Sequence, residues 1–241
     1  TLMALNTYFS LNLPSLFLFL ILLTGCNSKI DPSETLDPEP ITYLALGDSY
    51  TIGTGIAEDN NYPNQLTDTL TARGYTFDTT AVIATNGWTT TDLLNGIEKA
   101  DPLSDYNLVS LLIGVNNQYQ GLDMELYETE FMELLSQAIS FAGGDTSKVI
   151  VLSIPNYGVT PFGQSRNPVV IRQELEIYNS IAEEFALDYG IPFIDVTSIS
   201  ELAENDSTLL APDNLHPSAK MYAMWVHKML TNVTQVLDHN D

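Results

Sequence analysis

The sequence predicts an α/β domain in which a mostly parallel β-sheet lies between layers of helices. Short apolar runs alternate along the chain with longer segments whose apolar residues recur every three or four positions. The run Leu108–Ile113 (LVSLLI) is continuously apolar, as expected for a central parallel strand covered on both faces. Strands and helices that alternate in this way, joined by right-handed crossovers, form such a sandwich.

The predicted strands are short segments rich in apolar and β-branched residues, most of them bounded by turn-forming residues. In chain order they are Ile41–Leu46, Thr76–Ala84, Leu108–Ile113, Val149–Ile154 and Phe193–Val196.

The predicted helices carry apolar stripes at helical spacing, and several end at a glycine. In chain order they are Tyr62–Arg73, Thr91–Ile97, Asp123–Ala142, Pro168–Tyr189 and Ser218–Val236. The stripes assigned to the core include Tyr127, Phe131, Leu134, Leu135 and Ala138, then Ile171, Leu175, Tyr178 and Ala182, and finally Tyr222, Trp225, Met229 and Val233. No internal repeat or second domain is evident.

The N-terminal segment has a different composition. Leu16–Leu23 is almost entirely Leu, Phe and Ile, and small residues follow it, which is typical of the apolar core of a secretory signal peptide. The stretch Leu23–Cys26 (LTGC) resembles the bacterial lipobox, in which the peptidase cuts before the cysteine and that cysteine is acylated. Cys26 is the only cysteine of the chain, so a disulfide within a monomer is excluded.

These features predict a signal peptide over residues 1–25, an acylated Cys26 with a flexible Pro-containing tether over 26–40, and one domain over 41–241. The protein is then expected to be exported, monomeric and lipid-anchored to a membrane of a bacterial cell envelope. No Lys or Arg precedes the apolar run, unlike most signal peptides, and an uncleaved N-terminal anchor helix is the alternative.

The charge of the chain is strongly acidic, with 31 Asp and Glu against 8 Lys and Arg and a formal net charge of −23. Nucleic-acid binding depends on Lys and Arg to neutralise phosphates, so this balance argues against a nucleic-acid partner. It also disfavours electrostatic adhesion to anionic lipid, and a membrane contact would depend on the acyl anchor.

Polar residues follow the predicted strands at the edge where parallel sheets gather functional groups. Ser49 follows the first strand, Gly87 the second and Asn116 the third, and Asp213 and His216 precede the last helix. An Asp three residues before a His can bind one imidazole nitrogen and leave the other free to accept a proton. Ser49 is the candidate hydroxyl for that proton, and the pattern predicts a serine hydrolase.

Each of these residues also has a purely structural interpretation. Ser49 could cap the turn after the first strand, and Gly87, Asn116 and Asp213 could be turn residues. Their joint occurrence at one sheet edge favours catalysis. Asp48 is expected to hold the turn together, and His227 and His239 have no evident partner.

The order and spacing of Gly47-Asp48-Ser49, Gly87, Asn116 and Asp213-x-x-His216 resemble the motif blocks of the SGNH (GDSL) hydrolase family. The resemblance extends from about Ile41 to Trp225. It implies a flavodoxin-like three-layer sandwich with a five-stranded parallel sheet of order 2-1-3-4-5, and ester hydrolysis without a cofactor or a metal. It also implies an oxyanion hole formed by the backbone N–H groups of Ser49 and Gly87 and the amide of Asn116. Asn117 departs from the pattern, since many members carry Asp there.

The substrate is expected to be a small-molecule or glycan ester with a short acyl or acetyl group, such as O-acetylated carbohydrate. The resemblance is shared between lysophospholipase-like esterases and carbohydrate acetylesterases. A lysophospholipase or thioesterase for longer chains, and a non-catalytic lipoprotein that binds glycan or lipid, are therefore alternatives. Trp88, Tyr157 and Phe162 are candidate substrate-binding residues, the last two in an irregular connection predicted over Pro155–Asn167.

Overall fold

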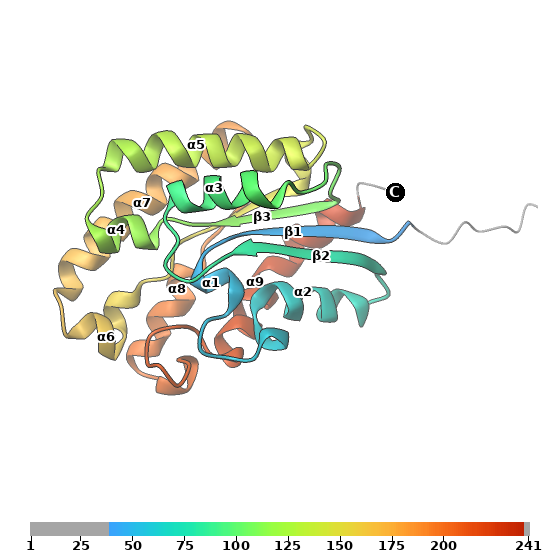
Figure 1. The fold of residues 1–241 in the computed structure, drawn as a ribbon. Coiled ribbons are helices and arrows are strands. Elements are labelled where there is room, and N and C mark those ends of the chain that lie inside the picture. Colours follow the sequence, from blue (N-terminus) through green and yellow to red (C-terminus); the bar gives the residue numbers. More distant parts are fainter. Residues whose placement is uncertain (1–38, 239–241) are drawn as a thin grey trace, which may run out of the picture. The chain divides into compact units, whose positions relative to one another are not determined.

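The computed structural model of the chain describes residues 39–238, which fold around a five-stranded parallel sheet (Figure 1). The strand order is β2-β1-β3-β4-β5, and every neighbouring pair is parallel. This order confirms the predicted fold class. The strands are β1 (Ile41–Gly47), β2 (Phe77–Ala84), β3 (Leu108–Leu112), β4 (Val149–Leu152) and β5 (Phe193–Ile194).

Long helices cover both faces of the sheet (Figure 1). On one face lie α3 (Thr90–Ala100), α5 (Met124–Phe141) and α7 (Pro168–Asp188). On the other lie α2 (Tyr62–Thr71) and α9 (Ala219–Asp238). Each corresponds to a predicted helix and differs from it only near its ends. The structure therefore has the predicted three layers.

Short helices follow the carboxyl ends of four strands, and hydrophobic patterning did not predict them. They are α1 (Ser49–Ile52), α4 (Val115–Gln120), α6 (Pro161–Gln164) and α8 (Thr197–Ser200). Segments of four to six residues are too short to display a helical period. Further 3₁₀ turns are η1 (Glu58–Asn60), η2 (Thr146–Lys148), η3 (Tyr157–Val159), η4 (Glu201–Glu204) and η5 (Ser207–Leu209).

The connection after β4 is more regular than expected. The prediction of an irregular segment over Pro155–Asn167 is wrong, because it contains η3 and α6. The side chain of Asn156 accepts the N–H of Gly158 at 2.9 Å, and the hydroxyl of Thr160 accepts the N–H of Gly163 at 3.1 Å. These local side-chain caps order the connection.

An aromatic cluster on the α2/α9 face joins the last helix to the first turn of the fold. Its members Tyr50, Tyr62, Tyr222 and Trp225 are buried, with ring centroids of neighbouring pairs 4.9–6.5 Å apart. The hydroxyl of Tyr222 donates to the backbone oxygen of Tyr50 at 2.8 Å. Because Tyr50 follows Ser49, α9 directly supports the turn that carries Ser49.

The predicted N-terminal features lie largely outside the described residues. This applies to the signal peptide, to Cys26 and to all of the tether except residues 39–40. Within residues 39–238, none of the helices combines the length and the apolar character needed to cross a membrane.

Candidate functional site

The predicted site residues meet at the carboxyl edge of the sheet. Ser49, Asn116 and His216 line one cavity of about 250 Å³, which opens between α1, α4 and the segment before α9. Gly87 lies in the turn between β2 and α3, beside this edge. The complete lining consists of Ser49, Tyr50, Asn86, Val115, Asn116, Tyr119, Tyr157, Phe162, Leu215 and His216.

The turn that carries Ser49 is sharp and closely packed. A Cβ atom at Gly47 would lie 2.5 Å from the backbone oxygen of Leu112, so only glycine permits this approach of β1 to β3. Asp48 then caps α1 by accepting the N–H of Tyr50 at 2.9 Å. Ser49 is the first residue of α1, so its own N–H has no partner within the helix.

Asp48 is almost completely buried, at 1% exposure. Burial raises its pKa from an ordinary value of 3.8 to about 7, although the hydrogen bond from the Tyr50 N–H acts in the opposite direction. Its carboxyl group contacts the turn and does not line the cavity. The structure thus gives Asp48 the role expected from the sequence, as a brace of the turn.

Asp213 and His216 form a closed hydrogen-bonded unit. Asp213 Oδ2 lies 2.7 Å from His216 Nδ1, and Asp213 Oδ1 accepts the backbone N–H groups of Leu215 and His216, both at 3.0 Å. Burial alone would raise the pKa of Asp213, but the hydrogen bonds from the side chain and backbone of His216 and from Leu215 lower it overall. The carboxylate therefore stays ionised and holds Nδ1, which leaves Nε2 as the nitrogen available for proton transfer.

Two neighbours fix this pair from outside, and no sequence pattern pointed to either of them. The ring of Tyr50 meets the imidazole of His216 edge-on, with centroids 5.5 Å apart. The backbone of Gly55, with φ of +89°, lies against Asp213, so that a Cβ atom there would be 2.9 Å from Asp213 Oδ2. The carboxylate accordingly has little room to turn away from His216.

Gly87 occupies a tight turn over residues 85–88. The N–H of Trp88 donates to the oxygen of Thr85 at 3.3 Å, and Gly87 has φ of +83°. This φ is the one that a type II turn requires at its third residue, which explains the glycine. A Cβ atom at position 87 would meet no protein atom within 4 Å, so backbone conformation and not packing within the protein demands glycine here.

Of the candidate substrate-binding residues, Tyr157 and Phe162 line the cavity and Trp88 does not. The indole of Trp88 packs on α3, where a Cβ atom at Gly96 would lie 2.3 Å from its ring. The backbone oxygen of Trp88 nevertheless contacts the site, because it accepts the side-chain N–H of Asn116 at 2.8 Å. The Asn116 amide keeps a second N–H for another acceptor.

Tyr119, Tyr157 and Phe162 form an aromatic wall along one side of the cavity, with ring centroids 5.9–6.3 Å apart. The guanidinium of Arg166 lies over the rings of Tyr119 and Phe162, at 4.7 and 4.6 Å, and donates to the Tyr119 hydroxyl at 2.8 Å. Neither Tyr119 nor Arg166 was predicted from the sequence. Tyr119 lies three residues after Asn116 on α4, a helix too short for its period to be recognised in the sequence.

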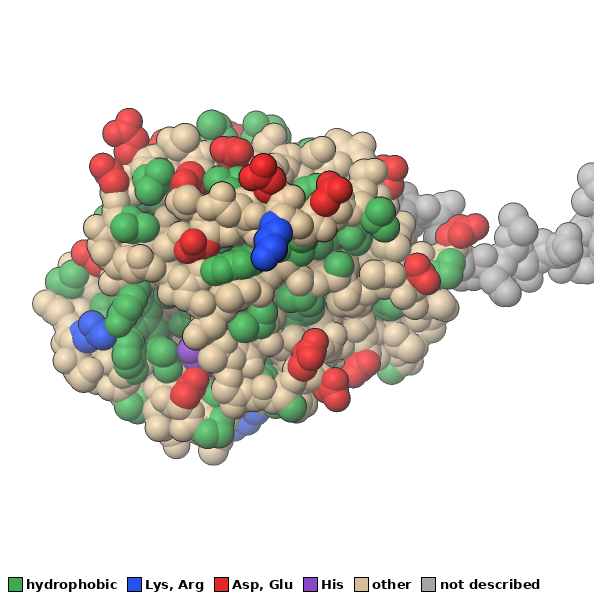
Figure 2. Space-filling view, in the orientation of Figure 1, with side chains coloured by type: hydrophobic (Ala, Val, Ile, Leu, Met, Phe, Trp, Pro, Cys, Tyr) green, Lys and Arg blue, Asp and Glu red, His purple; other side chains and the backbone are tan. Residues whose placement is uncertain are grey.

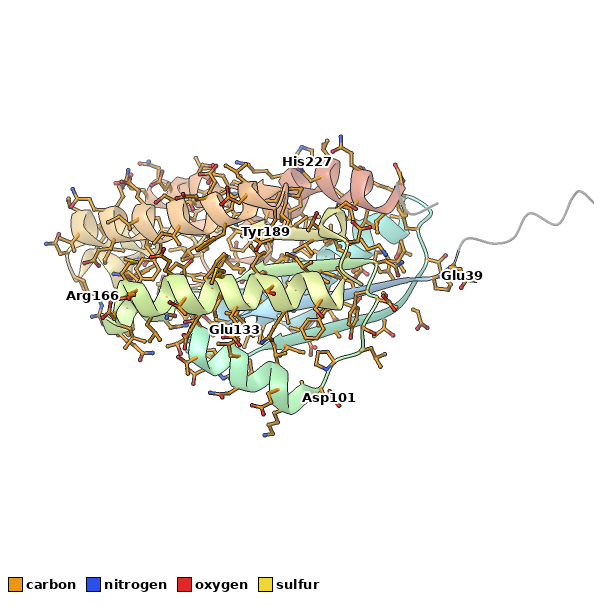
Figure 3. The ribbon with its side chains drawn as sticks, turned by 90° about the horizontal axis from the view of Figure 1, so that it is seen from above. Glu39, Asp101, Glu133, Arg166, Tyr189 and His227 are labelled. Carbon is orange, nitrogen blue, oxygen red and sulfur yellow. The ribbon has the colours of Figure 1, made fainter. Side chains whose placement is uncertain are left out.

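The wall lies at one end of the domain. Figure 3 places Arg166 there, at the end opposite Glu39, where the described chain begins. On the face seen in Figure 2, acidic side chains are scattered, whereas hydrophobic side chains gather near α4 and α6.

The two other histidines do not contribute to this edge. His227 is exposed on α9, far from Arg166 (Figure 3), and His239 lies outside the described residues. Within residues 39–238, no group of three or more His, Cys, Asp or Glu side chains is placed to hold a metal ion.

The sequence profile of the GDSL-like Lipase/Acylhydrolase family matches residues 45–224. No curated protein matches the chain. The fold is similar to that of TesA, with a TM-score of 0.63 and 17% identity over 81% of this chain and 99% of that one.

Two further solved structures are similar. Phospholipase A1 from Streptomyces albidoflavus NA297 has a TM-score of 0.63 and 20% identity over 80% of this chain and 99% of that chain. A variant of Axe2, an acetyl xylan esterase from Geobacillus stearothermophilus, has a TM-score of 0.60 and 20% identity over 80% and 94% of the two chains. At these identities the similarity concerns the fold alone.

Asp48→Asn is expected to gain stability relative to the wild type as the pH rises from about 4 to about 8. The buried carboxyl group, with its pKa raised from 3.8 to about 7, favours the protonated form, so its ionisation costs the wild type stability across this window. Asparagine keeps the oxygen that accepts the Tyr50 N–H. Urea unfolding at both pH values measures the difference, and a pH-independent difference would contradict the burial argument.

Gly55→Ala is expected to push the Asp213 carboxylate away from His216 and to raise the pKa of Asp213 toward its ordinary value. Gly144→Ala is the matched control, because its φ is +83° but a Cβ atom there meets nothing within 4 Å. Both variants carry a left-handed strain of about 1–2 kcal/mol. NMR titration of the Asp213 carboxyl should distinguish them, and equal pKa values in the two variants would refute the contact.

Proposed function

Because the chain belongs to the GDSL-like lipase/acylhydrolase family, we propose that it is a serine ester hydrolase that acts through an acyl-Ser49 intermediate on short acyl or acetyl esters. One observation carries this proposal. Asp213 and His216 are joined at 2.7 Å, and His216 lines the same cavity as Ser49 and Asn116. A polarised histidine, a hydroxyl and an amide donor around one cavity are the groups that acyl transfer needs.

In the first half of the reaction, Ser49 Oγ attacks the carbonyl carbon of the ester while His216 Nε2 takes its proton. The negatively charged Asp213 stabilises the imidazolium that forms. The carbonyl oxygen becomes an oxyanion, which the N–H groups of Ser49 and Gly87 and the Asn116 amide would bind. Collapse of this intermediate breaks the ester C–O bond, and His216 gives the proton to the departing alcohol.

In the second half, water replaces the alcohol. His216 removes one proton from water as its oxygen attacks the acyl carbon, and the same donors hold the second oxyanion. The bond to Ser49 Oγ then breaks, the proton returns to Ser49, and the free acid leaves. The reaction balances with water as the only co-substrate.

The size of the cavity supports a short acyl group. Its volume of about 250 Å³ lies below the range of roughly 300–1,000 Å³ that is typical of small-molecule sites. The aromatic wall limits it on one side, and Arg166 holds two of the three rings in place. A long acyl chain would have to displace this wall or extend into solvent.

We also propose that the protein is exported and anchored through an acylated Cys26. An enzyme in that location would meet O-acetylated carbohydrate, which is therefore the favoured short-chain substrate.

A lysophospholipase or thioesterase acting on longer chains is the second candidate function. The apolar character of the aromatic wall favours it, since Tyr119, Tyr157 and Phe162 could line an acyl chain. The two candidates differ in the chain length at which the rate is highest.

Ser49→Ala is expected to lower kcat for p-nitrophenyl acetate by at least about 1,000-fold, because the acyl-serine can no longer form. The exposed Ser180→Ala is the matched control. A fluorophosphonate probe should label the wild type and the control at Ser49 and leave Ser49→Ala unlabelled. Absence of both turnover and labelling in the wild type would instead favour a non-catalytic binding protein.

Phe162→Ala is expected to shift the preferred acyl chain of p-nitrophenyl esters toward longer chains by removing part of the aromatic wall. We expect kcat/KM for the acetyl ester to fall by less than about tenfold, because the wall does not touch the reacting atoms. Leu187→Ala, at an exposed position on α7, is the control. An acyl-length series from acetate to laurate measures the effect. A wild-type maximum at the long chains would favour the second candidate function.

A further inference from the structure

Two consecutive asparagines of α4 hold the backbone that follows Gly87, at the end of its turn and at the start of α3. Asn116 Nδ2 donates to the oxygen of Trp88 at 2.8 Å, and Asn117 Oδ1 accepts the N–H of Thr90 at 3.0 Å. Asn117 is completely buried and does not line the cavity. Its side chain therefore acts on the turn and not on a substrate.

The hydroxyl of Thr90 continues this contact to α5. Asn117 Nδ2 lies 2.6 Å from Thr90 Oγ1, which lies 2.5 Å from Glu130 Oε2. Because the Thr90 N–H requires an acceptor, the amide of Asn117 must present its oxygen there and its NH₂ group to the hydroxyl. The single hydroxyl hydrogen then goes to Glu130, which also accepts the hydroxyl of Thr91 at 2.7 Å.

We propose that Asn117 is a positioning residue, which sets the Gly87 turn through Thr90 and Glu130, and that the carboxylate of Glu130 is the reason this chain needs asparagine at position 117. The clamp consists of Asn117, Thr90 and Glu130. The catalytic role of the clamp rests on the proposed function, because the turn that it positions carries the Gly87 N–H and contacts Asn116. The direction of its hydrogen bonds rests on geometry alone.

An aspartate in place of Asn117 would disrupt this series of hydrogen bonds. Both oxygens of an aspartate are acceptors, and the one hydrogen of Thr90 Oγ1 cannot satisfy that carboxylate and Glu130 together. Two carboxylates would then face one hydroxyl, one of them fully buried, and like charges so close disfavour each other's ionisation. The turn would move to separate them, and a shift of about 1 Å in such a group can lower a rate by about 100-fold.

Removing the charge of Glu130 should repair this defect. In the double variant Asn117→Asp with Glu130→Gln, the new carboxylate accepts the Thr90 N–H and hydroxyl, and the new glutamine amide donates to the hydroxyl oxygen. The clamp would be satisfied again with its direction reversed. A residue that only fills space would not show such a rescue, because Glu130→Gln does not change the volume at position 117.

The experiment compares Asn117→Asp, Glu130→Gln, the double variant and the control Asn205→Asp, which adds the same charge at an exposed position. Initial rates with p-nitrophenyl acetate are divided by the concentration of active sites, which is measured by titration with the fluorophosphonate probe. We expect Asn117→Asp to lower kcat by about 10- to 100-fold with KM changed less than about threefold. Glu130→Gln and the control should stay within about threefold of the wild type, and the double variant within about fivefold.

A second readout does not depend on catalysis. Hydrogen exchange in the peptide covering residues 85–92 should quicken in Asn117→Asp and slow again in the double variant. Should the wild type neither turn over nor accept the probe, the proposed function fails, and this exchange pattern still decides whether the clamp exists.

The proposal is overturned if Asn117→Asp keeps the wild-type kcat and exchange, or if Glu130→Gln does not reverse its defects. Thr90→Val covers the case in which Asn117→Asp does not fold, since it removes the hydroxyl and keeps the shape. It should lower kcat by at least about fivefold and quicken exchange in residues 85–92. Wild-type values in Thr90→Val would equally refute the clamp.

Discussion

The position of β1 between β2 and β3 is the constraint on which the site depends. In a parallel sheet the chain leaves every strand at the same edge, so the segments after β1, β2 and β3 emerge side by side. Ser49, Gly87 and Asn116 follow these strands directly and are brought together although about 30–40 residues separate each from the next. The aromatic cluster, which includes Tyr50, packs the turn that carries Ser49 against α9, and the segment before α9 carries His216.

Two carboxyl groups at this edge, those of Asp48 and Asp213, have pKa values shifted in opposite directions by their surroundings. Asp48 is buried with a single hydrogen bond from the chain, and burial raises its pKa to about 7. Asp213 receives hydrogen bonds from the His216 ring and from two backbone N–H groups, and its pKa is lowered despite partial burial. The first is suited to brace a turn, and the second to remain charged beside an imidazolium.

Several polar side chains at the site form hydrogen bonds to the backbone of neighbouring segments. Asn116 and Asn117 form hydrogen bonds to the backbone of Trp88 and Thr90, just after Gly87. Asn156 and Thr160 order the segment that supplies Tyr157 and Phe162. Such hydrogen bonds are strong where water is excluded, and a buried polar group left without its partner lowers the stability of the fold. The shape of the cavity therefore depends in part on Asn117, Asn156 and Thr160, which do not line it. For this reason substrate preference is harder to predict than reaction class.

The sequence by itself determined the fold class, the five strands, the five long helices and the candidates Ser49, Asp213 and His216. These follow from local patterns: apolar periodicity selects strand or helix, and an Asp three residues before a His can close its hydrogen bond within one turn. Only the tertiary structure decided which residues share the cavity. Trp88 packs on α3, whereas Tyr119 lines the cavity, Arg166 packs on its aromatic wall and Gly55 contacts Asp213. These positions depend on how α3, α4 and the loops pack. The direction of the Asn117–Thr90–Glu130 chain likewise exists only once α3, α4 and α5 meet, since no local pattern relates residues that far apart.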